Sequence, residues 1–113
     1  MESFSITLVP FVFEGKKNVK FILEGELTIK NAKEIRQSMD AAISEHEGFE
    51  VVLENVLSLD VTFLQLLYSM EKTIRSQQKK MDLKMNLTAE IENILKYNGL
   101  EHMLQSQTFR ESL

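Results

Sequence analysis

The chain has 113 residues, 43% of them hydrophobic and 27% charged, which fits one soluble globular domain and argues against disorder of the whole chain. A formal net charge of −4 argues against a general binder of nucleic acid or anionic membrane, because phosphate recognition relies on clustered lysine and arginine. Cysteine is absent, which excludes disulfides and cysteine-ligated metals, and no run of about 20 apolar residues is present, so we expect a cytoplasmic protein without direct membrane insertion.

The first two predicted elements are strands joined by a turn. Apolar and polar residues alternate over Phe4–Leu8 and again over Val19–Leu23, which is the pattern of half-buried strands. Residues Glu14–Asn18 have the composition of a turn, and Pro10 has no backbone donor, so the first strand is expected to lie at a sheet edge or to break there. The start of the chain therefore predicts an antiparallel hairpin.

A helix and a buried strand are predicted next. Apolar residues recur at helical spacing on one face, namely Ala32, Ile35, Met39, Ala42 and Ile43. Thr28 can cap the start of this helix, and Gly48 is placed to end it. The nearly continuous apolar run Phe49–Leu53 favours a strand covered on more than one side.

The pattern over Phe63–Ser76 is again helical, and Asp60 or Thr62 is available as its N-cap. Apolar and polar residues alternate over Met81–Leu87, which predicts a further strand.

The last predicted helix has Thr88 as its cap and Gly99 as its stop. Its inner face consists of Ile91, Ile94 and Leu95. Leu100–Leu104 is expected to add a short strand or turn, and the tail 105–113 to be loosely held.

This order of elements predicts an α/β fold in a single domain spanning 1–113, with its core over about 4–104. The expected sheet is mixed and has four or five strands, in which an N-terminal antiparallel hairpin precedes right-handed parallel crossovers. The helices are expected mainly on one side of the sheet.

Four short stretches, in this order, resemble the STAS domain family, the fold of bacterial anti-sigma-factor antagonists. Residues 21–28 (FILEGELT) resemble the Gly-Glu-Leu-Asp stretch before the first helix, and residues 51–56 (VVLENV) resemble the central strand. Residues 59–67 (LDVTFLQLL) are similar to the family's Asp-Ser-Ser-Gly-Leu loop and helix start, and residues 98–100 (NGL) to its late Ser-Gly-Leu mark. The resemblance implies a STAS-like fold and a non-catalytic protein that docks onto a partner.

In that family, a serine kinase that is also an anti-sigma factor phosphorylates the first hydroxyl residue after the aspartate, and the docked complex is then lost. Asp60 matches the aspartate, but the acceptor position falls on Val61, which has no hydroxyl. Thr62 matches the second position, and Phe63 replaces the usual glycine.

In the earlier motif, Glu26 matches the glutamate and Thr28 replaces the aspartate. The resemblance leaves two alternatives for regulation. Thr62 is a phosphoacceptor one residue later, or the domain docks constitutively and the switch lies in its partner.

The second predicted helix has an apolar arc of roughly 200°, wider than the stripe of a little over 100° that burying one face requires. Its members are Phe63, Leu64, Leu66, Leu67, Tyr68, Met70 and Ile74. Either the helix is set deeply between neighbours, or part of the arc is a partner-binding patch, for which Phe63 is the best candidate for an exposed anchor. The predicted partner-binding residues are Asp60, Val61, Thr62, Phe63, Leu66 and Met70, although Asp60 and Thr62 also suit a purely capping role.

No glycine-rich phosphate loop, nucleophile–base pair or carboxylate dyad is present, and His46 and His102 have no second ligand at helical spacing. We therefore expect neither enzymatic activity nor a cofactor or metal. The leading hypothesis is a bacterial signalling module that docks a serine-kinase-type anti-sigma factor or a chemotaxis-type partner. The alternatives are a regulatory subunit of a lipid or ABC transport system and, less well supported, a nucleotide-binding module. A homodimer through the exposed helix patch is compatible with each of them.

Overall fold

The computed structural model describes residues 3–97. Within them, four strands form one sheet in the order β1-β2-β3-β4. The elements in chain order are β1 (Phe4–Phe13), β2 (Lys16–Leu27), α1 (Ile29–Ile43), β3 (Gly48–Leu59), α2 (Val61–Ser76), β4 (Lys80–Met85) and α3 (Ala89–Tyr97). β1 is antiparallel to β2, whereas β3 is parallel to both β2 and β4. The predicted mixed α/β sheet, with its hairpin and parallel crossovers, is confirmed.

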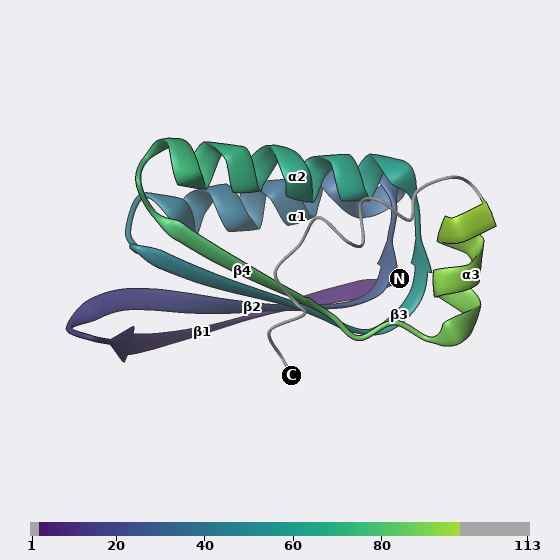
Figure 1. The fold of residues 1–113 in the computed structure, drawn as a ribbon, viewed down its shortest axis with the longest axis horizontal. Helices are drawn as coiled ribbons and strands as arrows, with labels where there is room; N and C mark the ends of the chain where they lie inside the picture. The colour runs from purple at the N-terminus through teal and green to yellow at the C-terminus, as the bar shows by residue number, and fades with distance from the viewer. Residues whose placement is uncertain (1–2, 98–113) are drawn as a thin grey trace.

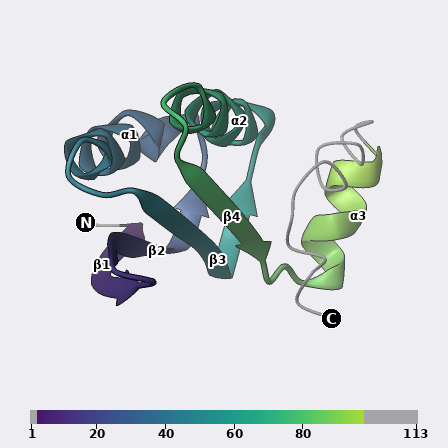
Figure 2. The ribbon, with the colours of Figure 1, turned by 60° about the vertical axis from the view of Figure 1, so that its left-hand side comes forward.

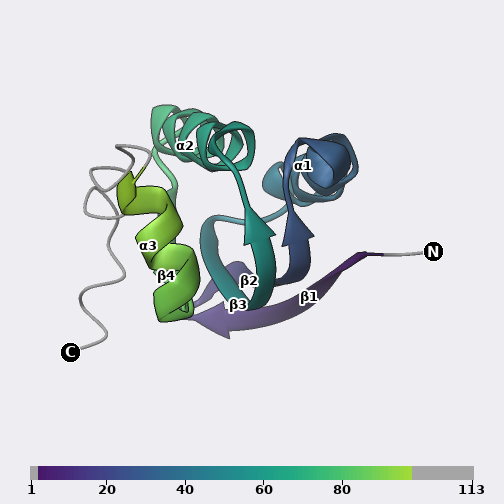
Figure 3. The same cartoon turned by 90° about the vertical axis from the view of Figure 1, so that its right-hand side faces the viewer.

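The helices form a layer over the sheet. Figure 1 shows α1 and α2 side by side over one face, with α3 near the end of the sheet where β3 finishes. Figures 2 and 3 place α2 between α1 and α3, with α3 beyond β4. None of the helices within residues 3–97 is long and apolar enough to span a bilayer. The arrangement gives α2 a neighbouring helix, α1, on one side and the sheet beneath it.

The hairpin turn is shorter than the sequence predicts. Glu14 and Gly15 have φ angles of 53° and 78°, and Phe13 pairs directly with Lys16. Two consecutive positive φ angles define a two-residue type I′ turn, whose twist suits the flanking strands. The residues predicted to complete the turn, Lys16–Asn18, therefore pair with β1 instead, and β1 continues through Pro10 as an edge strand.

Several other predicted ends are corrected. α1 ends at Ile43, and Gly48 is the first residue of β3 rather than the stop of the helix. β3 continues beyond Leu53 to Leu59, because its later residues still pair with β2. The fourth strand is Lys80–Met85, shifted from the predicted Met81–Leu87. The expected fifth strand or turn, Gly99 and the tail lie outside the described residues, so the single domain over 1–113 stays a prediction.

All three helices begin at a polar cap. The Thr28 hydroxyl accepts from the Lys30 amide at 3.3 Å, and the Thr88 hydroxyl accepts from the Ile91 amide at 3.2 Å. Asp60, rather than Thr62, caps α2, which therefore begins at Val61, before the predicted start. Each of these side chains satisfies an amide that has no partner within its helix.

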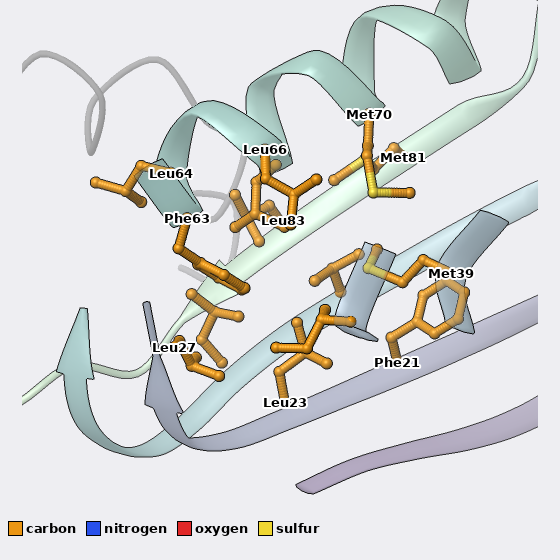
Figure 4. Packing of buried hydrophobic residues seen from close by; sticks show 14 of the residues in the cluster. Phe21, Leu23, Leu27, Met39, Phe63, Leu64, Leu66, Met70, Met81 and Leu83 are labelled. Carbon is orange, nitrogen blue, oxygen red and sulfur yellow. The ribbon is translucent and has the colours of Figure 1, made fainter. Parts of the chain in front are cut away.

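The core lies between the sheet and the helices. Figure 4 shows Phe63 and Met70 pointing from α2 toward the sheet, with Phe63 close to Leu27 and Met70 close to Met81. The buried cluster combines side chains of β2, β3 and β4 with those of all three helices. Phe21 and Phe49, on neighbouring strands, stack with ring centroids 6.3 Å apart.

A bulge at Gly25 bends the end of β2 toward the start of α1. Gly25 has a φ of 96°, and the register between β2 and β3 shifts on both sides of it. The neighbouring Glu24 carboxylate accepts from the Ser5 hydroxyl at 3.2 Å and from the side-chain Nδ2 of Asn55 at 2.6 Å. The bulge is thus tied to both neighbouring strands.

Candidate docking surface around Asp60

Asp60 joins the starts of two helices. Its Oδ1 accepts from the Phe63 amide at 2.9 Å, which caps α2, and its Oδ2 accepts from the Ile29 amide at 2.9 Å, at the first residue of α1. Both carboxylate oxygens are therefore bonded to backbone N–H groups, an arrangement that the positive ends of two helix dipoles favour. The predicted capping role of Asp60 is confirmed, and the loops that follow β2 and β3 are connected through one side chain.

Aliphatic side chains on the three segments that meet near Asp60, namely the end of β3 and the starts of α1 and α2, remain exposed to solvent. Ile29 is 67% exposed, Leu57 75% and Val61 39%. Thr62, in the first turn of α2, is partly buried. We call Ile29, Leu57, Asp60, Val61 and Thr62 the Asp60 rim. Exposed aliphatic residues at the ends of neighbouring elements are candidates for a surface that a partner covers.

Three of the predicted partner-binding residues do not reach this surface. Phe63 is 0% exposed, Leu66 8% and Met70 1%. The prediction that they contact a partner from the surface, with Phe63 as an exposed anchor, is wrong. The physical reason is the position of α2 beside α1 and above the sheet (Figures 2 and 3), which buries a wide arc of the helix. The alternative of a deeply set helix accounts for the wide apolar arc.

The accessible face of α2 is mixed in character. Val61, Gln65, Tyr68 and Lys72 are all exposed, and their spacing places them along one side of the helix. The Lys72 ammonium lies 5.1 Å from the centroid of the Tyr68 ring, within range of a cation–π interaction. We call these four residues the outer stripe of α2. It extends from the Asp60 rim along the helix.

Glu26 and Thr28, which match the earlier family motif, shape the loop before α1. Thr28 is the N-cap, and the Glu26 carbonyl accepts from the side-chain Nδ2 of the buried Asn31 at 2.8 Å. The same Asn31 Nδ2 donates to the Ser3 hydroxyl at 3.0 Å. The Glu26 carboxylate lies 3.8 Å from Lys30, but an exposed pair of this kind contributes less than about 1 kcal/mol. Both residues therefore position the Ile29 end of the rim.

Sequence reasoning missed two members of the rim. Ile29 directly follows a capping threonine, and Leu57 lies in a stretch of β3 whose side chains alternate irregularly between the core and solvent. Residue type alone does not distinguish a buried isoleucine or leucine from an exposed one. The one sequence signal for the exposure of Ile29 was its position at a helix start, among polar residues. Among the described residues, no group of three or more His, Cys, Asp or Glu could hold a metal ion.

Comparison with known families identifies the domain. The family model described as Mlab, STAS domain, matches residues 14–105, which is most of the chain. The chain belongs to this STAS domain family. The resemblance stated from the four sequence stretches is therefore confirmed at the level of the family. A search of curated proteins found no match.

Solved structures share the fold of this STAS domain. The anti-sigma factor antagonist SpoIIAA in its unphosphorylated form has a TM-score of 0.64 and 18% identity, over 88% of this chain and 84% of that one. An anti-sigma factor antagonist from Mycobacterium paratuberculosis has a TM-score of 0.64 and 17% identity, over 87% of this chain and 81% of that one. SLC26A9 has a TM-score of 0.59 and 14% identity, over 77% of this chain but 17% of that one, so there the fold is one part of a much longer chain.

Proposed function

We propose that this STAS domain is a non-catalytic, cytoplasmic docking module of a bacterial signalling system. It binds a serine-kinase-type anti-sigma factor or a chemotaxis-type protein through the Asp60 rim and the outer stripe of α2. The observation that carries this proposal is the exposure of Ile29, Leu57 and Val61 on the segments that meet near Asp60, whose carboxylate is already satisfied by two backbone amides. The likeness in fold to two anti-sigma factor antagonists supports it.

The chemistry of the rim suits binding better than catalysis. Both oxygens of Asp60 accept from amides, so this carboxylate is poorly placed to take a proton from a substrate. The exposed aliphatic residues of the rim offer area that a partner can remove from water, and the buried core of a protein interface is more apolar than the rest of the surface.

Replacing Val61 with glutamate is expected to weaken partner binding by more than about tenfold, because a partner would have to desolvate a new charge next to Asp60. Glutamate at the first position of a helix suits the dipole, so the fold should keep its stability. The measurement is isothermal titration calorimetry with the candidate partner.

Gln37→Glu is the matched control, since it adds the same charge at an exposed position of α1. The control should bind as tightly as the unmodified domain. Equal affinity of Val61→Glu and Gln37→Glu would remove the Asp60 rim from the interface.

Phosphorylation is expected to play little part in this domain. Val61 cannot accept a phosphate, and a phosphate on Thr62 would place new negative charge in the same turn as the Asp60 carboxylate, where like charges repel. Mass spectrometry after incubation with a cognate kinase and ATP should show no modification of residue 61 and, at most, slow transfer to Thr62. Stoichiometric phosphate on Thr62, abolished by Thr62→Val, would overturn the constitutive mode of docking.

A second candidate is a regulatory subunit of a membrane lipid or ABC transport system. The match to the Mlab STAS model and the valine at the acceptor position favour it, because neither points to a phosphorylation switch. Co-purification separates the two candidates. A transporter subunit captured by the unmodified domain and lost with Val61→Glu supports the second, whereas a kinase-type protein with the same behaviour supports the first.

A further inference from the structure

We propose that the outer edge of β1 binds a second copy of this chain as an antiparallel strand, so that the two sheets join into one continuous sheet. This contact goes beyond the proposed docking function and uses other residues than the Asp60 rim. It rests on the length, polarity and backbone geometry of β1.

Within residues 3–97, the backbone of β1 presents groups without a strand partner along one edge of the sheet. Among the described residues, β1 pairs with β2 alone, over ten residues, and a strand of this length spans about 34 Å. The Ser3 carbonyl accepts from the Glu26 amide at 2.8 Å, which shows that odd-numbered residues direct their backbone groups toward β2. Because this direction alternates in an antiparallel ladder, the backbone N–H and C=O groups of the even-numbered residues point away from β2. These are Phe4, Ile6, Leu8, Pro10 and Val12.

The two outer strands of the sheet differ in their protection. β4 has six residues and carries charge at every second position, with Lys80, Asp82 and Lys84. Short length and charged side chains are the usual defence of a strand against edge-to-edge pairing. β1 is longer and has no charged residue at all. Its one defence is Pro10, which removes a single outward N–H group.

The side chains of β1 fit another copy of the same strand. Leu8 and Val12 are exposed on the helix side of the sheet, and Val9, Phe11 and Phe13 are exposed on the other side. In a two-fold symmetric contact the same patch meets itself, so a charged residue on the two-fold axis would face a like charge. Each copy has a net charge of −4, and the ten uncharged residues of β1 allow two copies to meet without local repulsion. A charged partner strand would find no opposite charge here.

The outward backbone groups also select a register. Centring the pair on Leu8 matches every outward residue from Phe4 to Val12 with one in the second copy. Leu8 then faces Leu8 of the second copy, and Ile6 faces Pro10, whose carbonyl still accepts a hydrogen bond. Because Pro10 has no N–H group, one hydrogen bond between the two strands is lost on each side of the two-fold axis. The other opposed outward residues keep both of their hydrogen bonds.

Sedimentation velocity of the full chain tests the proposal directly. Between about 5 and 500 µM, the unmodified chain should show a reversible monomer–dimer equilibrium, as expected for a weak complex. Leu8→Pro removes an N–H group that points away from β2, so the hairpin is retained, and it should raise the dissociation constant by more than about tenfold. Leu8→Ala keeps the N–H group and should have a smaller effect. Circular dichroism and thermal melting report whether Leu8→Pro has the unmodified fold.

Three outcomes overturn the proposal: a monomer at every concentration, a dimer unaffected by Leu8→Pro in its native fold, or equal weakening by Leu8→Pro and Leu8→Ala. The last outcome would indicate side-chain contact without strand pairing.

A cysteine test remains decisive if Leu8→Pro fails to fold. The chain has no cysteine, so Leu8→Cys introduces a single thiol. Directly opposed residues in this ladder have Cα atoms about 5.5 Å apart, which suits a disulfide. With oxidised glutathione, Leu8→Cys should form covalent dimers at least about tenfold faster than Asp82→Cys, an exposed control on β4. Equal rates for the two variants contradict the edge pairing.

Discussion

Truncation of Phe63 to alanine is expected to lower the free energy of unfolding by about 3–5 kcal/mol, the usual cost of deleting a buried phenylalanine side chain. The ring is fully buried and points from the first turn of α2 toward Leu27 and the sheet (Figure 4). Its removal leaves a cavity where the helix start, the end of β2 and the Asp60 cap meet. Urea denaturation followed by far-UV circular dichroism measures the change.

Tyr68→Ala provides the control for this variant, because Tyr68 lies on the same helix but is 46% exposed. We expect it to cost no more than about 1 kcal/mol, mainly through loss of the contact with Lys72. A Phe63→Ala variant with unchanged stability but lost partner binding would restore Phe63 as a surface anchor and contradict the burial described above.

Gly25→Ala is expected to destabilise the fold by more than about 3 kcal/mol, because two penalties combine at this position. A φ of 96° is strained for any residue with a side chain. A Cβ atom on Gly25 would also lie 2.4 Å from the Ser3 carbonyl oxygen, closer than real contacts allow. Relief would require the start of β1 to move and would strain the bond between that oxygen and the Glu26 amide.

The control for Gly25→Ala is Gly15→Ala. Gly15 also has a positive φ, of 78°, but a Cβ atom there meets nothing within 4 Å. This variant carries the backbone strain without the clash and should cost about 1 kcal/mol. Thermal or urea unfolding of both variants separates the cost of the backbone strain from the cost of the clash. Equal losses of stability in the two variants would show that the clash with the Ser3 carbonyl oxygen is unimportant.

The two proposed contacts are carried by different parts of the sheet. The Asp60 rim lies where β2 and β3 end and the helices begin, whereas the β1 contact follows the outer edge of the hairpin. A dimer paired through β1 would present two Asp60 rims at once, one from each chain. Bivalent presentation of this kind raises apparent affinity for a dimeric partner without any new contact.

Local patterns in the sequence were enough to predict most of the strands and helices. The period-two alternation around Val19–Leu23 and the helical spacing of Ile35 and Met39 predict elements that the structure contains. The caps at Thr28 and Thr88 were also predictable, because capping depends on residues within one turn of each other. Element ends were harder to place. The hairpin turn closed after two residues, and β3 ran on to Leu59, because strand pairing with a distant segment decides where a strand stops.

The sequence by itself determined the order of strands and helices, the capping residues and the STAS resemblance, because each depends on neighbours within a few positions along the chain. The tertiary structure alone decided which apolar side chains a partner can reach. Phe63, Leu66 and Met70 are buried and Ile29 and Leu57 are exposed, because burial depends on how α1 and the sheet pack against α2. The tertiary structure also decided that both oxygens of Asp60 accept hydrogen bonds, since the second donor is the amide of Ile29, which is distant in the sequence.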